Sequence, residues 1–234
     1  PTPEARMRRL PLAALALAVS LPALADDKAP PKWPLLFEDD FSKGADHWRP
    51  TDADAWKVID TKKGKAYSQF KQSKYKPRYR SPLNFALVKD LPVQDFVLEA
   101  DVQSTARDYD HRDMCLFFGY QGPNNFYYVH LGKKTDDHAN QIFIVNGADR
   151  KKISTKTTAG TPWDDRWHHV KVVRTAGDGG IAVYFDDMKA PVMTATDKTF
   201  AAGRVGVGSF DDTGNWANVK VYGTTIRPPK RPGS

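Results

Sequence analysis

The sequence predicts an all-β protein, built as a two-sheet antiparallel jelly-roll sandwich. Three observations favour this class. Short apolar runs alternate with polar residues at the period of two that a half-buried strand requires. Turn-forming clusters of Gly, Pro, Asn and Asp, such as 122–125, separate these runs. No amphipathic helix of normal length stands out along the chain.

The first strand is predicted at 35–41, and a loop containing Trp48 and Trp56 follows it. The alternation is clearest within 96–103, where Leu98 shares a face with its apolar neighbours and Glu99 lies on the opposite face. The further strands predicted up to residue 155 are 57–59, 66–70, 83–87, 113–121, 126–131, 141–146 and 151–155.

The last third of the domain carries the strongest strand pattern. Gly177–Gly180 supplies a turn between two runs of alternating residues, which is typical of a hairpin. Two more runs follow, at 205–207 and 219–221. We expect six valines to face the interior between the two sheets: Val170, Val172, Val205, Val207, Val219 and Val221.

This closing region reads WHHVKVVRTAGDGGIAVYFDD and then GRVGVGSFDDTGNWANVKVYG. It resembles the last strands of the concanavalin A-like lectin and glucanase jelly rolls, and it is similar to exported 3-keto-disaccharide hydrolase, glucanase-like and laminin-G-like domains. The resemblance covers residues 35–223. It implies a jelly-roll sandwich and contact with glycans. It does not imply catalysis, because a shared fold does not by itself supply a catalytic site.

The amino-terminal residues predict export. Arg8 and Arg9 precede an apolar run that ends at Ala25, which is the pattern of a secretory signal peptide. We therefore interpret 1–25 as a signal peptide with extra residues upstream and expect a periplasmic or extracellular protein. The remaining segments are a Pro-rich leader at 26–34, a single jelly-roll domain at 35–223 and a disordered tail at 224–234.

The composition limits the partners. The 234-residue chain has a formal net charge of +7, and region 61–80 carries eight basic residues and no acidic one. Aromatic residues lie between these cations, a combination that fits an acidic polysaccharide or an anionic surface; a solvated loop is the alternative. Because we expect export, we expect no nucleic-acid partner. No membrane-spanning segment is expected in the mature chain, and we expect a monomer.

Cys115 is the single cysteine, which excludes an internal disulfide and suggests a small core residue. A candidate site lies on the neighbouring strands. Tyr128 and His130 share one strand face, and Tyr120 joins them if 113–121 and 126–131 pair, with Arg112 at the rim. Aromatic rings stack on sugar rings, while directional polar groups bind hydroxyls.

The candidate catalytic residues are His130, Tyr128 and Arg112, and the candidate sugar-binding residues are Tyr120, Gln141, His111, Asn146 and Arg80. The alternative is that Tyr128 and His130 pack into the sandwich.

The sequence is compatible with three functions. The first is an exported protein that binds glycans, with hydrolysis left open. The second is a polysaccharide lyase on uronate polymers, in which Arg80 or Arg112 neutralises the carboxylate and Tyr128 or His130 moves the proton. The third is a non-catalytic envelope protein that binds an anionic surface through region 61–80.

No cofactor is expected apart from a structural Ca²⁺. Sandwiches of the resembled type often bind calcium between the first and the last strand. Asp39 and Asp40 lie at the end of the first predicted strand and Asn218 in the last. Their oxygen atoms are the hard ligands that Ca²⁺ prefers.

Overall fold

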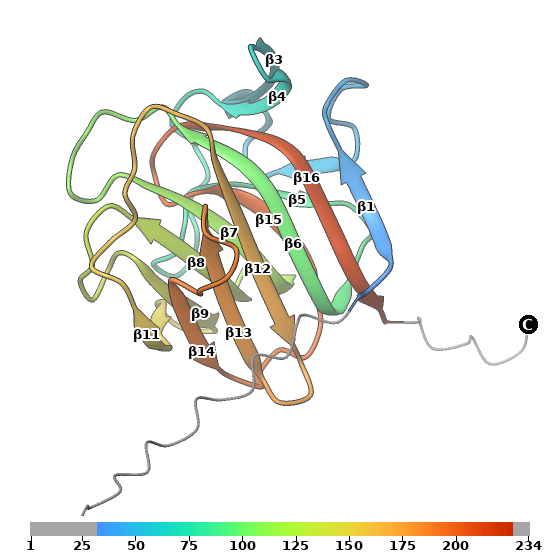
Figure 1. The fold of residues 1–234 in the computed structure, drawn as a ribbon, viewed down its shortest axis with the longest axis vertical. Helices are drawn as coiled ribbons and strands as arrows, with labels where there is room; N and C mark the ends of the chain where they lie inside the picture. The colour runs from blue at the N-terminus through green and yellow to red at the C-terminus, as the bar shows by residue number, and fades with distance from the viewer. Residues whose placement is uncertain (1–31, 227–234) are drawn as a thin grey trace, which may run out of the picture. The chain divides into compact units, whose positions relative to one another are not determined.

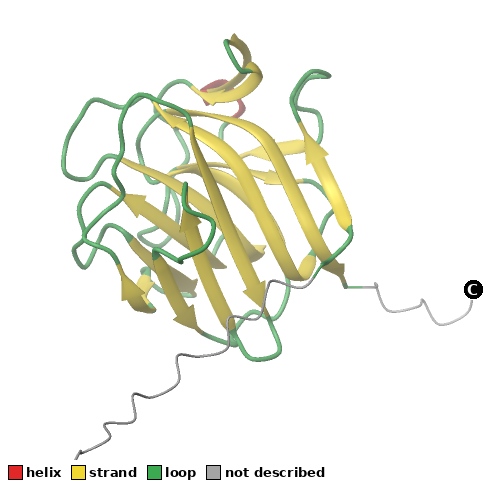
Figure 2. Cartoon of the chain, in the orientation of Figure 1, coloured by secondary structure: helices red, strands yellow, loops and turns green. Residues whose placement is uncertain are grey.

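The computed structural model describes residues 32–226 as two antiparallel β-sheets that pack face to face (Figure 1). The predicted signal peptide, most of the leader and most of the tail lie outside these residues. Strands form nearly all of the regular structure, and a short 3₁₀-helix at Ala53–Ala55 is the one helix among residues 32–226 (Figure 2). The predicted all-β jelly-roll class is confirmed.

Sheet A contains nine strands. In spatial order, eight of them are β11 (Ser154–Thr157), β14 (Met193–Thr196), β13 (Gly180–Phe185), β12 (His168–Thr175), β6 (Val93–Ser104), β16 (Gly214–Thr225), β4 (Gly64–Gln69) and β3 (Trp56–Thr61). The ninth, β1 (Leu35–Asp39), also pairs with β16.

Sheet B contains seven strands. Their spatial order is β10 (Lys151–Lys152), β9 (Gln141–Asn146), β8 (Asn125–Gly132), β7 (Asp113–Gly122), β15 (Arg204–Ser209), β5 (Asn84–Val88) and β2 (Trp48–Pro50). The chain crosses repeatedly from one sheet to the other, as in a jelly roll. The consecutive strands β15 and β16, for example, lie in different sheets.

The core between the sheets follows from the alternation in the sequence. All six valines expected there are 0% exposed and belong to one apolar cluster. In β6 the side chain of Leu98 joins this cluster, while that of Asp101 lies on the opposite face. The strand phase predicted for β6, β12, β15 and β16 is therefore confirmed.

Several strand boundaries differ from the prediction. The first strand ends at Asp39 because its carboxylate accepts the backbone N–H of Phe41, which turns the chain at a φ of 60°. The run predicted at 151–155 divides into β10 and β11, which belong to different sheets. The short strands β2 and β14 were not predicted.

The central strands of sheet B are buried on both faces. The residues of β5 are all buried, and so are most of those in β7, β8 and β9. A second apolar cluster on the outer face of this sheet consists of Phe85, Leu87, Cys115, Phe117, Phe126, Tyr128, Phe143 and Val145. Tyr75, Tyr120 and Phe210 pack against it. The outer face of sheet B therefore carries a further layer of side chains.

Among residues 32–226, no helix has the length and apolar character needed to cross a membrane.

Candidate functional site: a groove over the outer face of sheet B

Part of the layer over sheet B comes from residues 73–80, which we call the basic strip. Its sequence, SKYKPRYR, alternates small or aromatic residues with cations, and the exposure of its side chains alternates in the same way. The partly buried residues are Ser73, Tyr75, Pro77 and Tyr79; the exposed ones are Lys74, Lys76, Arg78 and Arg80. An extended backbone sends neighbouring side chains to opposite sides, so aromatic rings face the protein and cations face solvent.

Hydrogen bonds hold the basic strip at both ends. The backbone N–H of Lys74 donates to the Asp52 carboxylate over 2.7 Å. At the other end, the N–H of Arg80 donates to Asp149 over 2.9 Å, and its carbonyl accepts the N–H of Arg150 over 3.1 Å. The strip is thus positioned although it belongs to neither sheet.

A groove of about 420 Å³ runs along the basic strip. Strip residues 73–80, together with Ser81, Leu83 and Phe210, line it. The ring of Tyr75 meets that of Phe85 edge to face, which connects the strip to the aromatic cluster on sheet B. The groove therefore combines an aromatic wall with cations at its rim.

The cations of the strip have few intramolecular partners. Lys74 lies 3.9 Å from the Asp54 carboxylate, with both side chains largely exposed. Within residues 32–226, no carboxylate forms an ion pair with Lys76, Arg78 or Arg80, although Arg78 lies over the ring of Tyr79 at 5.5 Å. These positive charges are available to a negatively charged ligand.

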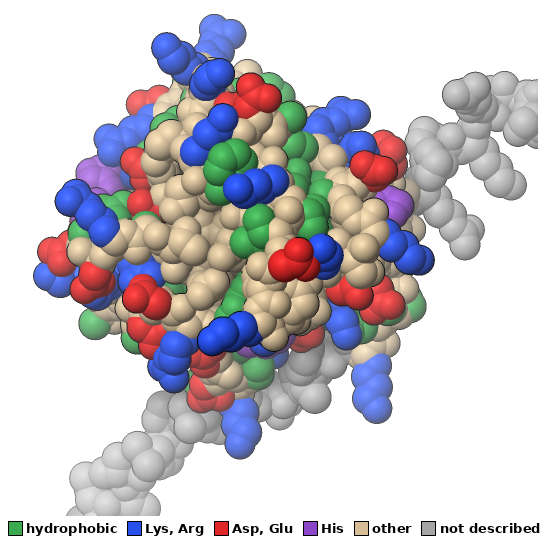
Figure 3. Space-filling model, turned by 90° about the horizontal axis from the view of Figure 1, so that it is seen from above, with side chains coloured by type: hydrophobic (Ala, Val, Ile, Leu, Met, Phe, Trp, Pro, Cys, Tyr) green, Lys and Arg blue, Asp and Glu red, His purple; other side chains and the backbone are tan. Residues whose placement is uncertain are grey.

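Positive charge alone does not mark the site. In the space-filling view, Lys and Arg side chains are spread over the face shown, with hydrophobic side chains exposed between them (Figure 3). What distinguishes the basic strip is that its cations border a groove with an aromatic wall.

Tyr128 and His130 share one face of β8, as their parity predicts, and both lie beneath this layer. Tyr128 is 0% exposed, and its hydroxyl accepts a hydrogen bond from Arg150 over 2.7 Å. Burial raises its pKa well above the usual value. His130 is 4% exposed and stacks on Phe210. The expectation that these two residues lie on an accessible face is wrong, because Arg150 and Phe210 cover them.

Arg112 does not approach Tyr128. Its guanidinium is 2% exposed and donates to the side chain and carbonyl of Ser104, to the Asp164 carbonyl and to the Asp165 carboxylate. The distances from the guanidinium nitrogens to these acceptor oxygens are 2.9–3.0 Å. The prediction that Arg112 belongs to the same surface is therefore wrong, since its donors are used where β6 meets the loop before β12.

The remaining predicted sugar-binding residues do not form one exposed face: Gln141 and His111 both contact Asp136, whereas Asn146 lies at the other end of β9. Gln141 pairs with His130 in the sheet register, is 4% exposed and donates to the Asp136 carbonyl. His111 is half-exposed and contacts the Asp136 carboxylate. Asn146 is exposed at the end of β9 and accepts from Asn125.

Tyr120 packs on Phe85 and Phe126 and has Arg204 over its ring. Of the predicted residues, only Arg80 lines the groove of the basic strip.

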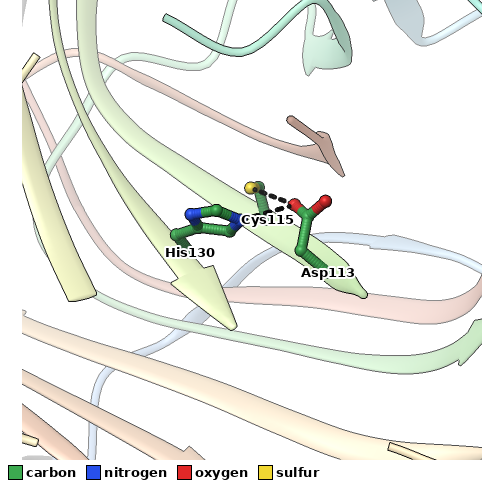
Figure 4. A group of neighbouring side chains, drawn as sticks. All are labelled: Asp113, Cys115 and His130. Carbon is green, nitrogen blue, oxygen red and sulfur yellow. Dashed lines mark hydrogen bonds and ion pairs between the residues drawn. The ribbon is translucent and has the colours of Figure 1, made fainter. Parts of the chain in front are cut away.

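A polar cluster is buried beside the groove. Asp113 and Cys115 extend from β7, and His130 extends toward them from β8 (Figure 4). The Asp113 carboxylate accepts hydrogen bonds from the Cys115 thiol over 3.2 Å and from the Phe210 backbone N–H over 2.8 Å. His130 Nε2 lies 3.1 Å from the same carboxylate oxygen.

Two further carboxylates approach Asp113 from the loop between β15 and β16. One carboxylate oxygen from each of Asp113, Asp211 and Asp212 lies within 4.8 Å of the corresponding oxygens of the other two. Burial, followed by the charge of Asp113, raises the pKa of Asp212 to about 6 and also raises that of Asp211. Tyr109 and the Asp113 backbone N–H each donate to Asp212 over 2.8 Å.

The residues proposed for calcium do share one surface pocket, of about 660 Å³, that is lined by Asp39, Asp40 and Asn218 among others. However, both Asp39 oxygens accept hydrogen bonds, from Phe41 and Trp48, and Asp40 accepts from Ser42. Asn218 donates to Asp101. Calcium at this position stays a prediction.

No protein-family model matches this chain, and no curated protein matches it. Solved structures do match. The carbohydrate-binding module CBM66 from Bacillus subtilis is 21% identical, with a TM-score of 0.53 over 75% of this chain and 95% of that one. The likeness is in the fold, a sandwich of two antiparallel sheets.

Two further solved structures give the same result. Domain 4 of AbnA, a GH43 extracellular arabinanase from Geobacillus stearothermophilus, was solved with arabinotriose; it is 13% identical, with a TM-score of 0.51 over 84% of this chain and 95% of that one. A Bacillus subtilis protein of unknown function with a galectin-like fold is 10% identical, with a TM-score of 0.56 over 82% of this chain and 97% of that one. At these identities the likeness concerns the fold, so a function has to be argued from the site itself.

Sequence reasoning missed Arg150 and Phe210, and it did not bring the acids of SFDDTG next to Asp113. The sequence SFDDTG does place an aromatic residue before two adjacent acids, but Arg150 lies in a turn-rich segment without a recognisable motif. Only the folded chain shows that these residues meet above β7 and β8.

Proposed function

We propose that this protein is an exported, non-catalytic binding protein that takes an acidic glycan into the groove of the basic strip. The observation that carries this proposal is the placement of Lys76, Arg78 and Arg80, without carboxylate partners among residues 32–226, along a groove walled by Tyr75 and Tyr79.

The two kinds of side chain recognise different parts of such a ligand. The apolar C–H faces of a pyranose ring stack on aromatic side chains, and its carboxylate or sulfate groups pair with cations. Arg78 and Arg80 can donate two hydrogen bonds to one carboxylate, which a lysine cannot do in the same planar geometry. The groove is therefore suited to a sugar polymer that carries regular negative charges.

The proposal is binding rather than catalysis because the candidate catalytic residues are covered. Tyr128 is fully buried with a raised pKa, and Arg112 is occupied by its four acceptors. A lyase needs a proton acceptor that touches the sugar next to a group that neutralises its carboxylate. The lyase alternative receives no support from this geometry, and hydrolysis receives none either.

The likeness in fold to a carbohydrate-binding module agrees with the proposal but does not carry it. Export rests on the predicted signal peptide alone. Binding to an anionic cell surface through the same cations would be a variant of this function if the surface presents acidic glycans.

The test compares matched double variants. Arg78→Ser/Arg80→Ser removes two cations at the groove, whereas Lys189→Ser/Lys198→Ser removes two exposed lysines elsewhere, so both lose the same net charge. We expect the first variant to lower the affinity for acidic oligosaccharides roughly tenfold or more, since each paired charge contributes about 1 kcal/mol. We expect the control to bind almost as tightly as the wild type.

Equal affinities in the two variants would overturn the proposal, because the charge effect would then be non-specific. Tighter binding of a single-stranded DNA oligomer than of every acidic glycan would also overturn it, in favour of nucleic acid as the ligand.

A further inference from the structure

The cluster beneath the groove brings together an oxygen, a sulfur and a nitrogen atom that could bind a metal ion. Asp113 and Cys115 are 0% exposed and His130 is 4% exposed. One donor atom from each lies within 4.8 Å of those of the other two. None of these residues takes part in the proposed glycan groove.

The hydrogen bond made by Nδ1 of His130 determines whether the other ring nitrogen, Nε2, can bind a metal ion. Its Nδ1 lies 2.8 Å from the His138 carbonyl oxygen. A carbonyl only accepts hydrogen bonds, so Nδ1 carries the proton and Nε2 is left with a lone pair or takes a second proton. Nε2 has no hydrogen-bond partner of suitable geometry among residues 32–226, and neither has Asp113 Oδ1. Buried polar atoms without partners are rare because they are costly.

This arrangement is the one that metal-binding histidines adopt. Their other ring nitrogen donates to a carbonyl or carboxylate, which fixes the ring with the free nitrogen toward the ion. The carboxylate of Asp113 is oriented in a similar way, by the backbone N–H of Phe210. Both prospective ligands therefore already have the supporting hydrogen bonds that a metal site needs.

We propose that Asp113, Cys115 and His130 bind a divalent ion of the Zn²⁺ class. The combination of carboxylate oxygen, thiolate sulfur and imidazole nitrogen suits zinc, whereas calcium takes oxygen ligands. Metal–ligand bonds of about 2.0–2.3 Å in a tetrahedron separate the ligand atoms by about 3.3–3.6 Å. The present contacts of 3.1 and 3.2 Å would need to widen by only a few tenths of an ångström.

Metal binding replaces the proton on the Cys115 sulfur. The S–H bond breaks, the proton leaves to solvent and the thiolate forms the bond to the ion, with no change of oxidation state. The exposed Asp211 has a carboxylate oxygen within 4.8 Å of one of Asp113. Three protein ligands leave the fourth tetrahedral position to a water molecule or a further carboxylate. Through Phe210, the ion would hold one wall of the groove.

The experiment uses the full chain, stripped with a chelator and then titrated with Zn²⁺ or Co²⁺. We expect one ion per chain, a thiolate-to-cobalt charge-transfer band in the near ultraviolet, and a higher melting temperature with zinc. Cys115→Ser should abolish the band and weaken zinc binding by more than the roughly 10–100-fold that loss of an outer-shell partner costs. The control His169→Gln alters a histidine–aspartate pair on sheet A and should change neither.

Equal zinc affinity in Cys115→Ser and wild type would overturn the proposal, as would Co²⁺ binding without a thiolate band. Because the Cys115→Ser variant could fail to fold, X-ray absorption at the zinc edge of the wild-type protein provides a second, independent test. One sulfur neighbour among nitrogen and oxygen neighbours supports the site. A shell of oxygen and nitrogen alone overturns it and leaves a hydrogen-bonded cluster with a proton on Nε2.

Discussion

Arg150 connects the groove to the buried face of sheet B. Its guanidinium donates to the Tyr128 hydroxyl over 2.7 Å and lies over the rings of Phe143 and Phe210, at 4.6 and 4.3 Å from their centroids. A planar cation is suited to this position because it can stack between two rings and still donate in its own plane. The residue thus satisfies a buried phenol and keeps Phe210 over His130.

Arg150→Lys should reveal the importance of this stacking. Lysine keeps the charge but cannot cover two rings and reach Tyr128 at once, so we expect the free energy of unfolding to fall by about 1–3 kcal/mol. Urea denaturation measures this. Arg166→Lys is the matched control, since Arg166 is exposed and pairs with Asp164 at the surface; its effect should stay within about 0.5 kcal/mol. Similar losses in both variants would show that the stacked arrangement is unimportant.

At the scale of elements, Asp101 joins three neighbouring strands of sheet A. It lies on β6, opposite His169 of β12 in the register, and His169 Nδ1 is 2.9 Å from its carboxylate. Asn218 of β16 and Lys63 from the β3–β4 turn donate to the other oxygen over 2.8 and 2.6 Å. One carboxylate therefore receives donors from both adjacent strands and from a turn.

This network makes the stability depend on pH. Burial by itself would raise the pKa of Asp101, but the hydrogen bonds from His169, Lys63 and Asn218 outweigh it and lower the pKa well below the ordinary value. Since the folded state binds this proton more weakly than the unfolded state, the stabilisation is present above about pH 4 and is lost as the pH falls further.

Asp101→Asn should therefore lower the free energy of unfolding by roughly 2 kcal/mol at pH 7. The difference from wild type should shrink between pH 4 and pH 2, because the wild-type carboxylate becomes protonated as well. Denaturant unfolding at several pH values measures it, with Asp60→Asn as the control because Asp60 is an exposed residue of β3. A difference that stays constant down to pH 2 would contradict the charge-based explanation.

The elements also show how far sequence reasoning reaches. Period-two alternation predicted the phase of β12, β15 and β16 correctly, because one face of each strand packs between the sheets. The same logic placed Tyr128 and His130 on one face but gave no information on what covers that face. The cover comes from Arg150 and Phe210, which lie in loops distant in sequence and have no periodic signal.

At the scale of the whole molecule, the fold class followed from alternation and turn residues, while the site depended on loops. Arg80 was predicted to bind sugar, and it lines the groove together with its neighbours. Arg112 was misplaced because its burial depends on acceptors in Asp164 and Asp165, which only the tertiary structure brings near. Loop positions of this kind are determined by long-range contacts that a single sequence does not reveal.

Export is a prediction about the amino-terminal residues of the chain. The predicted signal peptide should be removed after Ala25, so that Asp26 becomes the first residue of the mature protein. Intact-mass measurement of material secreted from, or held in the periplasm of, an expressing bacterium gives the answer. A mature product that retains Arg8 and Arg9 would contradict the prediction.

The central claim, that the groove binds an acidic glycan, is tested most directly by calorimetric titration of the wild-type protein with charged and neutral oligosaccharides of equal length. The acidic ligands are oligogalacturonate, oligoalginate and chondroitin sulfate, and cello- and xylo-oligosaccharides are the neutral controls. We predict that at least one acidic ligand binds roughly tenfold or more tightly than the neutral ones and weakens as salt screens the cations. Equal binding of charged and neutral ligands, or no binding of any acidic ligand at low salt, would contradict the account.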